Sequence, residues 1–241
     1  MKLVRVAATA AASILASVGK EIGGPYSAPA YANPSCSSGT AAPYQAGLLD
    51  GNGRTGAQGE FLRYVPQLCT PGSSASSVWV TTTNLSNRAF QVGWVKTTNF
   101  TDKQHVYYFW ADNNTGLFPV QLGEVDQSGQ TGTTDEFTVY TDGNCNTFGV
   151  INGGGVANDS LGCYANTGEW VGEVYNSATQ LPGATGKHEI IKLMQGLHNG
   201  SWANEPATNQ MSGLGSTENF PPNGAMSTST SNYFGMWDSR F

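Results

Sequence analysis

Short apolar runs, most of them alternating with polar residues, recur from residue 59 to the end of the chain, between clusters of Gly, Asn, Ser, Thr and Pro. A period of two is typical of strands with one buried face, and the intervening residues favour turns. About ten antiparallel strands at this spacing predict an all-β fold, a β-sandwich of the concanavalin-like jelly-roll type. The expected strands cover residues 59–65, 76–83, 88–96, 105–111, 117–123, 136–141, 146–153, 169–176, 188–194 and 231–237.

Three segments do not follow this alternation. Residues 33–56 are predicted to be a loop-like, extended N-terminal segment, followed by a single sandwich domain over residues 57–241. The stretch HEIIKLMQGLHN at 188–199 has a pattern compatible with a helix, but its β-branched Ile pair favours a strand equally. Residues 213–231, rich in Gly, Ser, Thr and Pro, are predicted to form a long exposed loop.

Residues 1–32 have the features of a secretory signal peptide. A short basic region precedes an Ala-rich apolar stretch that is too short to span a bilayer, and APAYA before Asn33 is a small-x-small cleavage site. We therefore expect a secreted, extracellular protein that has no membrane association once the signal peptide is removed.

An even number of cysteines remains after export, which indicates disulfides in an oxidising compartment. Three connectivities are possible. Proximity in the sequence favours two local pairs, Cys36 with Cys69 and Cys145 with Cys163.

Charge excludes one class of partner. The formal net charge is -6 and the sequence pI about 4.9, so no basic stripe is available to neutralise phosphates, and we expect no nucleic-acid binding. Metal binding is disfavoured because the sequence has no CxxC spacing and its three histidines lie far apart. GxSxG, HExxH and P-loop motifs are absent as well. We expect a monomer without metal or cofactor.

Two predicted strands carry polar residues beside small ones. In AFQVGW, alternation places Gln91 on one face with Ala89 and Gly93. In GEWVGEVY, the same rule places Glu169 and Glu173 together on one face. Both strands can therefore present a polar side chain to a cleft.

FQVGW and the later EWVGEVY together resemble the glutamic peptidases (eqolisins). These are β-sandwich enzymes whose catalytic glutamine and glutamate lie on neighbouring strands of the concave sheet. The family's glutamate follows another glutamate by four residues and a tryptophan by three, the pattern of Glu169, Trp170 and Glu173. The resemblance implies that Gln91 and Glu173 are the catalytic pair of an endopeptidase that acts in acid, with a polypeptide substrate.

The strand VYYFWADNNTG and the opening GAQGEFLRYVPQL, followed by SSVWV and QVGW, are more similar to neprosin-type peptidases. Neprosins carry a glutamate at the position of Gln91. The resemblance therefore implies eqolisin-like chemistry on a domain whose N-terminal half has neprosin-like features.

Further residues are assigned to the predicted cleft from the same alternation. Tyr107, Phe109 and Tyr175 contact a substrate if their strands share one sheet with Gln91, and Trp79 lies near the cleft. Glu169 is either a second carboxylate on the catalytic face or a residue of its rim. Trp94 falls on the face opposite Gln91, which favours a role in the core.

Two alternatives remain open. EWVGE resembles the E-x-D-x-E strand of laminarinase-like glycosidases, with Glu169 and Glu173 in the outer positions, but Val171 replaces the central aspartate. Alternatively, the six tryptophans and ten tyrosines stack against a polysaccharide, which would make the protein a lectin-like module without catalysis.

Overall fold

The computed structural model describes residues 43–51, 53–68, 72–82, 88–100, 105–112, 117–125, 131–159, 165–205, 224–228 and 233–241. Over these residues the chain forms fifteen strands and no helix, which confirms the all-β prediction. No segment of them is a helix long and apolar enough to cross a membrane.

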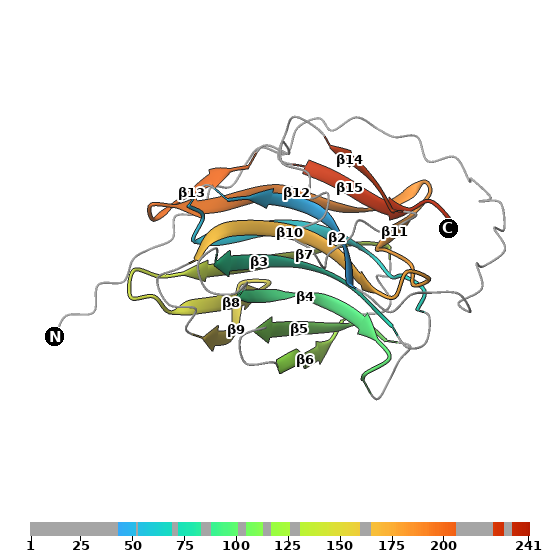
Figure 1. Ribbon diagram of the computed structural model, residues 1–241, viewed down its shortest axis with the longest axis horizontal. Coiled ribbons are helices and arrows are strands. Elements are labelled where there is room, and N and C mark those ends of the chain that lie inside the picture. Colours follow the sequence, from blue (N-terminus) through green and yellow to red (C-terminus); the bar gives the residue numbers. More distant parts are fainter. Residues whose placement is uncertain are drawn as a thin grey trace. The chain divides into compact units, whose positions relative to one another are not determined.

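The strands form two sheets that pack face to face as a sandwich (Figure 1). The six-stranded sheet has the spatial order β1 (Pro43–Asp50), β10 (Ala165–Tyr175), β3 (Ser73–Thr82), β4 (Ala89–Thr97), β5 (Tyr107–Asp112), β6 (Leu117–Glu124). The nine-stranded sheet has the order β14 (Gly224–Thr228), β15 (Tyr233–Asp238), β11 (Gly183–Ala184), β12 (Lys187–His198), β2 (Gly56–Tyr64), β7 (Thr131–Thr141), β8 (Thr147–Ile151), β9 (Gly154–Asp159), and β13 (Ser201–Asn204) pairs with β12.

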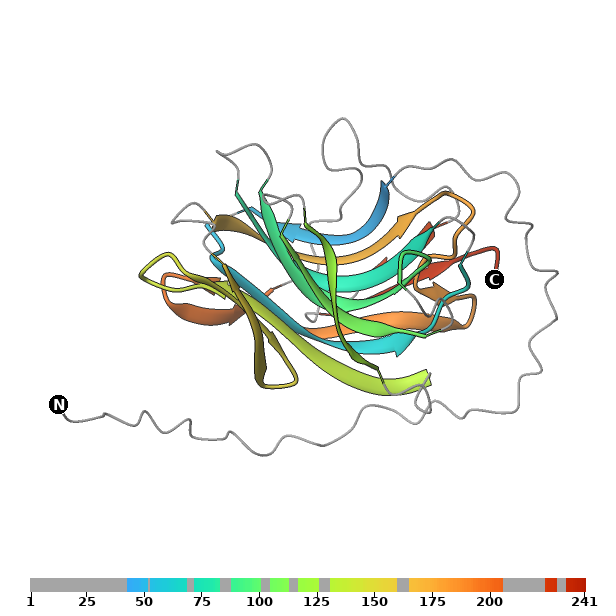
Figure 2. The same ribbon diagram turned by 90° about the horizontal axis from the view of Figure 1, so that it is seen from below.

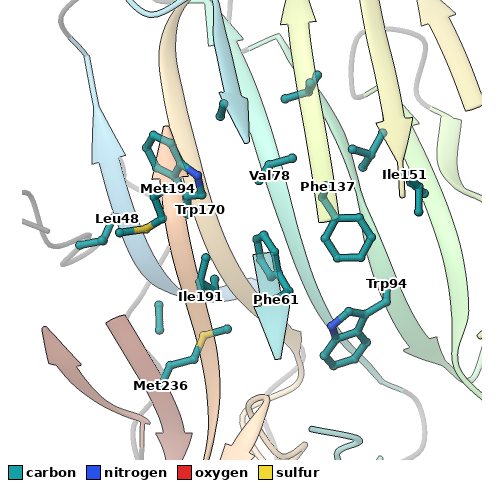
Figure 3. Packing of buried hydrophobic residues seen from close by; sticks show 14 of the residues in the cluster. Leu48, Phe61, Val78, Trp94, Phe137, Ile151, Trp170, Ile191, Met194 and Met236 are labelled. Atoms are coloured by element: carbon teal, nitrogen blue, oxygen red, sulfur yellow. The ribbon is translucent and has the colours of Figure 1, made fainter. Parts of the chain in front are cut away.

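Large apolar side chains from both sheets meet in one buried cluster. Figure 3 shows Trp94 and Trp170 of the six-stranded sheet packed with Phe61, Phe137 and Ile191 of the nine-stranded sheet. Burial of apolar area of this kind is the main favourable term in folding. The core role predicted for Trp94 is confirmed, because its side chain is fully buried in this cluster.

Both buried indoles also form a hydrogen bond to the opposite sheet. Nε1 of Trp94 donates to Oε1 of Glu189 at 3.2 Å, and Nε1 of Trp170 donates to the backbone oxygen of Gln58 at 2.7 Å. A buried indole N–H left without an acceptor would cost free energy, so these bonds favour one arrangement of the two sheets.

The six-stranded sheet is bowed, and its hollow side faces away from the nine-stranded sheet (Figure 2). The side chains on this hollow side form two small clusters separate from the main core. We call this surface the open face. It is the surface on which the predicted site residues lie.

Each of the ten predicted apolar runs coincides with a strand, and β1, β9, β11, β13 and β14 were not predicted. The expected loop at 33–56 is wrong for residues 43–50. These residues form edge strand β1, which inserts Ala46 and Leu48 into the core. The expected loop at 213–231 is wrong for β14 in the same way. Residues 188–198 belong to strand β12, so of the two possibilities left open for this stretch the strand is the correct one.

Residues 1–42 lie outside the described part of the chain, and so the signal peptide stays a prediction. Cys36, Cys69 and Cys163 also fall outside it, whereas Cys145 is described and is not a free thiol. Both predicted disulfide pairings therefore stay predictions.

Candidate active site on the open face

Gln91 lies on the open face of β4, and its side chain is anchored. The hydroxyl of Ser77, on neighbouring strand β3, donates a hydrogen bond to Oε1 of Gln91 at 3.1 Å. Nε1 of Trp79 in turn donates to the Ser77 oxygen at 2.5 Å. Because the carbonyl end of the Gln91 amide accepts a bond from Ser77, the N–H₂ end is the one left for a ligand.

Glu173 lies on the same face of β10, but β10 and β4 are not neighbours. Strand β3 separates them, which differs from the neighbouring strands that the eqolisin resemblance implied. The register pairs Glu173 with Ala75 and Gln91 with Trp79. Glu173 is therefore two strands and four residues away from Gln91 along a diagonal of the sheet.

Ser77 occupies the midpoint of this diagonal. It pairs with Gly93 on the β4 side and with Val171 on the β10 side. Each diagonal step in an antiparallel sheet spans roughly 7–8 Å between Cα atoms. Ser77, a small and buried residue, thus lies between the two polar residues in the register of the sheet.

At Gly93, strand β4 lies so close to β3 that only a glycine fits. A Cβ built on Gly93 would lie 2.1 Å from the backbone oxygen of Ser76 and 2.5 Å from Cβ of Ser77. No side chain fits there without moving the backbone of β3, which carries the anchor of Gln91.

A cavity of about 270 Å³ lies on the open face and is lined by both Gln91 and Glu173. Its lining combines apolar residues with polar ones. The remaining lining residues are Gly72, Ser73, Ala75, Val95, Thr97, Asn99, Phe109, Pro119 and Tyr175. Its size suits one or two side chains of a larger ligand, because pockets for whole drug-sized molecules start near ~300 Å³.

Glu169 shares the face of Glu173 but not its environment. Its side chain is 1% exposed, and Oε1 accepts a hydrogen bond from the hydroxyl of Thr81 at 2.8 Å. It pairs with Trp79 and does not line the cavity, whereas Glu173 is half-buried and does. Of the two carboxylates, Glu173 is the one that a ligand in the cavity can reach.

The predicted substrate contacts divide into two groups. Phe109 and Tyr175 line the cavity, with Tyr175 44% exposed. Tyr107 and Trp79 lie on the open face but are buried, and neither lines the cavity; the Tyr107 ring packs edge-on against Phe100. The condition that β5 and β10 share one sheet with Gln91 is met.

Ser77 was missed from the sequence, although the pattern SSVWV contains the necessary signal. Alternation places Ser77 and Trp79 on one face. Only the pairing of β3 with β4 identifies Gln91 as the partner of that serine.

A second missed residue lies in the core between the two sheets, on a strand of the nine-stranded sheet. Glu189 on β12 is fully buried and accepts bonds from the indole of Trp94 and from the backbone N–H of Tyr64. Desolvation raises the pKa of Glu189 to about 8, although the bonds from Tyr64, Trp94 and Ser76 oppose the shift. A largely neutral carboxyl group therefore links the two sheets beneath the site at neutral pH.

Within the described ranges, no three His, Cys, Asp or Glu side chains gather where they could hold a metal ion.

No family model matches the sequence, and no curated protein matches it. Among solved structures, scytalido-glutamic peptidase with a peptide-based transition state analog aligns with a TM-score of 0.58 and 8% identity, over 83% of this chain and 100% of that chain. SCP-B, a member of the eqolisin family in complex with the tripeptide Ala-Ile-His, aligns with a TM-score of 0.53 and 8% identity over the same shares. At such identity the similarity establishes the fold. The eqolisin-like fold is confirmed, and the neprosin-like features stay a prediction.

Proposed function

We propose that this protein is a secreted endopeptidase that hydrolyses peptide bonds in acid, with Gln91 and Glu173 as its catalytic pair. The observation that carries the proposal is that one cavity on the open face is lined by both side chains. The fold that the chain shares with glutamic peptidases supports the same chemistry.

Glu173 supplies the base and the acid in this mechanism. Its carboxylate removes a proton from a water molecule as that water attacks the peptide carbonyl carbon. The protonated carboxyl then returns the proton to the nitrogen of the leaving amine as the C–N bond breaks. A carboxyl group suits this cycle in acid, where it exchanges a proton readily.

Gln91 stabilises the negative charge that develops during the reaction. Its amide N–H donates to the oxyanion that develops on the carbonyl oxygen, and a donor of this kind contributes ~2.7–4 kcal/mol. The bond from Ser77 supports this role because it holds the carbonyl end of the amide in place before substrate arrives.

The glycosidase alternative has no observation in its favour. Retaining glycosidases need two carboxyl groups that both reach the sugar. Glu169 is 1% exposed, and its carboxyl group accepts a hydrogen bond from Thr81. Glu169 also does not line the cavity.

The test is digestion of an acid-denatured protein between about pH 3 and 7 by wild type and by the variants Glu173→Gln and Glu169→Gln. We expect wild type to cleave best in acid, Glu173→Gln to lose at least about 100-fold in kcat, and Glu169→Gln to keep most of its activity. Near-ultraviolet circular dichroism checks that each variant is folded. Full activity in Glu173→Gln would overturn the assignment. A folded wild type that cleaves nothing would overturn the peptidase proposal itself.

A further inference from the structure

Trp202 lies on the outer face of the nine-stranded sheet, on the opposite side of the sandwich from the cavity. It belongs to β13, whose four residues are all exposed, and its own side chain is 36% exposed. A single exposed aromatic side chain is ordinary, whereas a contiguous exposed patch with polar residues around it marks a binding surface. The neighbours of this indole indicate what the surface binds.

The indole of Trp202 extends across the outer face of the sheet. Trp202 pairs with Leu197 on β12, and Leu197 pairs with Gly56 on β2. A Cβ built on Gly56 would lie 3.0 Å from Cη2 of Trp202, so the ring reaches across β12 to β2. Because 36% of the residue is exposed, part of the indole stays accessible to a ligand.

Two more aromatic rings continue the row beyond Gly56. Tyr140 on β7 pairs with Gly56, and Phe148 on β8 pairs with Tyr140. The Tyr140 and Phe148 rings are stacked, with centroids 5.2 Å apart and planes at 26°, and both are half-buried. The row Trp202, Tyr140 and Phe148 is named here the aromatic row.

A row of side-chain amides lies beside the aromatic row on the same face. Gln58 Nε2 donates to Oε1 of Gln195 at 2.5 Å, and Gln195 Nε2 donates to Oδ1 of Asn204 at 3.0 Å. Asn204 is two positions from Trp202 along β13, which is about 7 Å in a β-strand. Gln195 and Gln58 are two positions from Leu197 and Gly56, the residues across which the Trp202 indole extends. Gln58 and Gln195 also line a cavity of about 220 Å³.

The geometry points to a binding site for a neutral polysaccharide on this face. The apolar face of a pyranose ring is flat and stacks on an exposed aromatic ring. Sugar hydroxyls both donate and accept hydrogen bonds, as the amides of glutamine and asparagine do. Rings and amides about 7 Å apart offer both contacts to one sugar unit.

The acidic residues around this site disfavour anionic glycans. The cavity beside the amide row is also lined by Glu60 and Glu136, which lie directly opposite each other on β2 and β7. Lys192 pairs with Glu60 at 3.1 Å, and the whole chain carries a formal net charge of -6. Sulfated or uronic glycans would be repelled here, and so would nucleic acids. The site therefore favours an uncharged chain such as a β-linked glucan.

The test is sedimentation of the protein with insoluble cellulose, β-1,3-glucan and starch, with wild type, Trp202→Ala and Trp237→Ala compared. Trp237 is a matched control because it lies on the same sheet but is stacked against His188, with ring centroids 3.9 Å apart. We expect at least one neutral glucan to bind wild type, Trp202→Ala to lose at least tenfold in affinity, and Trp237→Ala to bind as wild type. A sulfated glycan is expected not to bind.

Three results would overturn the inference. They are no binding of any neutral glucan by folded wild type, equal binding by wild type and a folded Trp202→Ala variant, or a dimer in light scattering that Trp202→Ala converts to a monomer. The last would make the aromatic row an interface between copies of the chain. The variant Gln195→Ala gives a second readout and should weaken binding without lowering the melting temperature by more than a few degrees. This binding site does not depend on the proposed peptidase activity.

Discussion

The hydroxyl of Ser77 donates a hydrogen bond to Oε1 of Gln91 at 3.1 Å, and the same serine lies halfway along the sheet diagonal that joins Gln91 to Glu173. Ser77 thus holds the carbonyl end of the Gln91 amide, while its own side chain is buried and does not line the cavity.

Ser77→Ala removes the anchor of the Gln91 amide while keeping the residue small. A hydrogen bond of this kind contributes ~0.5–1.5 kcal/mol, so we expect kcat on a peptide substrate to fall roughly 3- to 10-fold with little change in KM. Steady-state kinetics in acid measure the effect. Ser201→Ala, at an exposed position of β13 in the other sheet, is the control and should retain the wild-type kcat. Equal kcat in Ser77→Ala and wild type would contradict a positioning role for the serine.

Gly93→Ala is expected to damage both the fold and the site. The new Cβ would meet backbone and side-chain atoms of Ser76 and Ser77 at 2.1–2.7 Å, and overpacking of this kind costs ~1–3 kcal/mol. Urea unfolding measures the loss. Gly155→Ala is the control, since no atom lies within 4 Å of its Cβ position. If Gly93→Ala were as stable as Gly155→Ala, the prediction would be wrong, because β3 would then move aside with little loss of unfolding free energy.

The stability of the fold should decrease as pH rises from acid to weakly alkaline. Burial raises the pKa of Glu189 from 4.5 to about 8 in the folded protein. Below pH 4.5 both folded and unfolded states hold this proton, so the burial of Glu189 carries no penalty from deprotonation there. Between pH 4.5 and 8 the unfolded chain releases this proton first, and the free energy of unfolding falls by up to about 1.4 kcal/mol per pH unit.

Urea unfolding at about pH 4, 6 and 8 measures this dependence. Glu189→Gln should flatten it, because the amide stays neutral throughout. A remaining slope is expected from Glu205, since burial and the neighbouring Asp50 raise the pKa of Glu205 to about 7. Gln121→Ala, at an exposed position of β6, is the control and should keep the wild-type slope because it changes no titratable group. Equal slopes in Glu189→Gln and wild type would refute the prediction.

Asp135→Asn is expected to destabilise the protein by ~3–5 kcal/mol, because it leaves the buried Arg63 guanidinium without its counter-charge. Nη1 of Arg63 contacts Oδ2 of Asp135 at 2.5 Å, and both side chains are almost fully buried. Removal of the more exposed Lys192 and Glu60 pair should cost less than about 1 kcal/mol. Chemical denaturation of Asp135→Asn and Lys192→Met compares the two pairs, and similar losses would contradict the prediction.

The same substitution has a spectroscopic readout. Burial, followed by the hydrogen bond to Asp135, raises the pKa of Tyr108 to about 12. Asp135→Asn should lower that pKa, measured as tyrosinate absorbance during an alkaline titration.

Alternation along the chain was sufficient to identify most strands and to assign a face to the main site residues. Gln91 and Glu173 lie on the open face and Trp94 lies in the core, as their positions in AFQVGW and GEWVGEVY predicted. These assignments succeed because successive side chains of a strand point to opposite faces, and this geometry belongs to the backbone itself. Edge strand β1 was missed because its turn-rich surroundings hide a short alternating segment.

Only the tertiary structure decided which residues meet. The local pattern treats Glu169 and Glu173 alike, yet one is buried against Thr81 and the other lines a cavity. The pattern also gives no reason to expect a buried carboxyl at Glu189 or a serine midway between Gln91 and Glu173. The side of the sheet to which a side chain points follows from its own strand alone. Burial, strand order and register depend on residues that are far apart in the sequence.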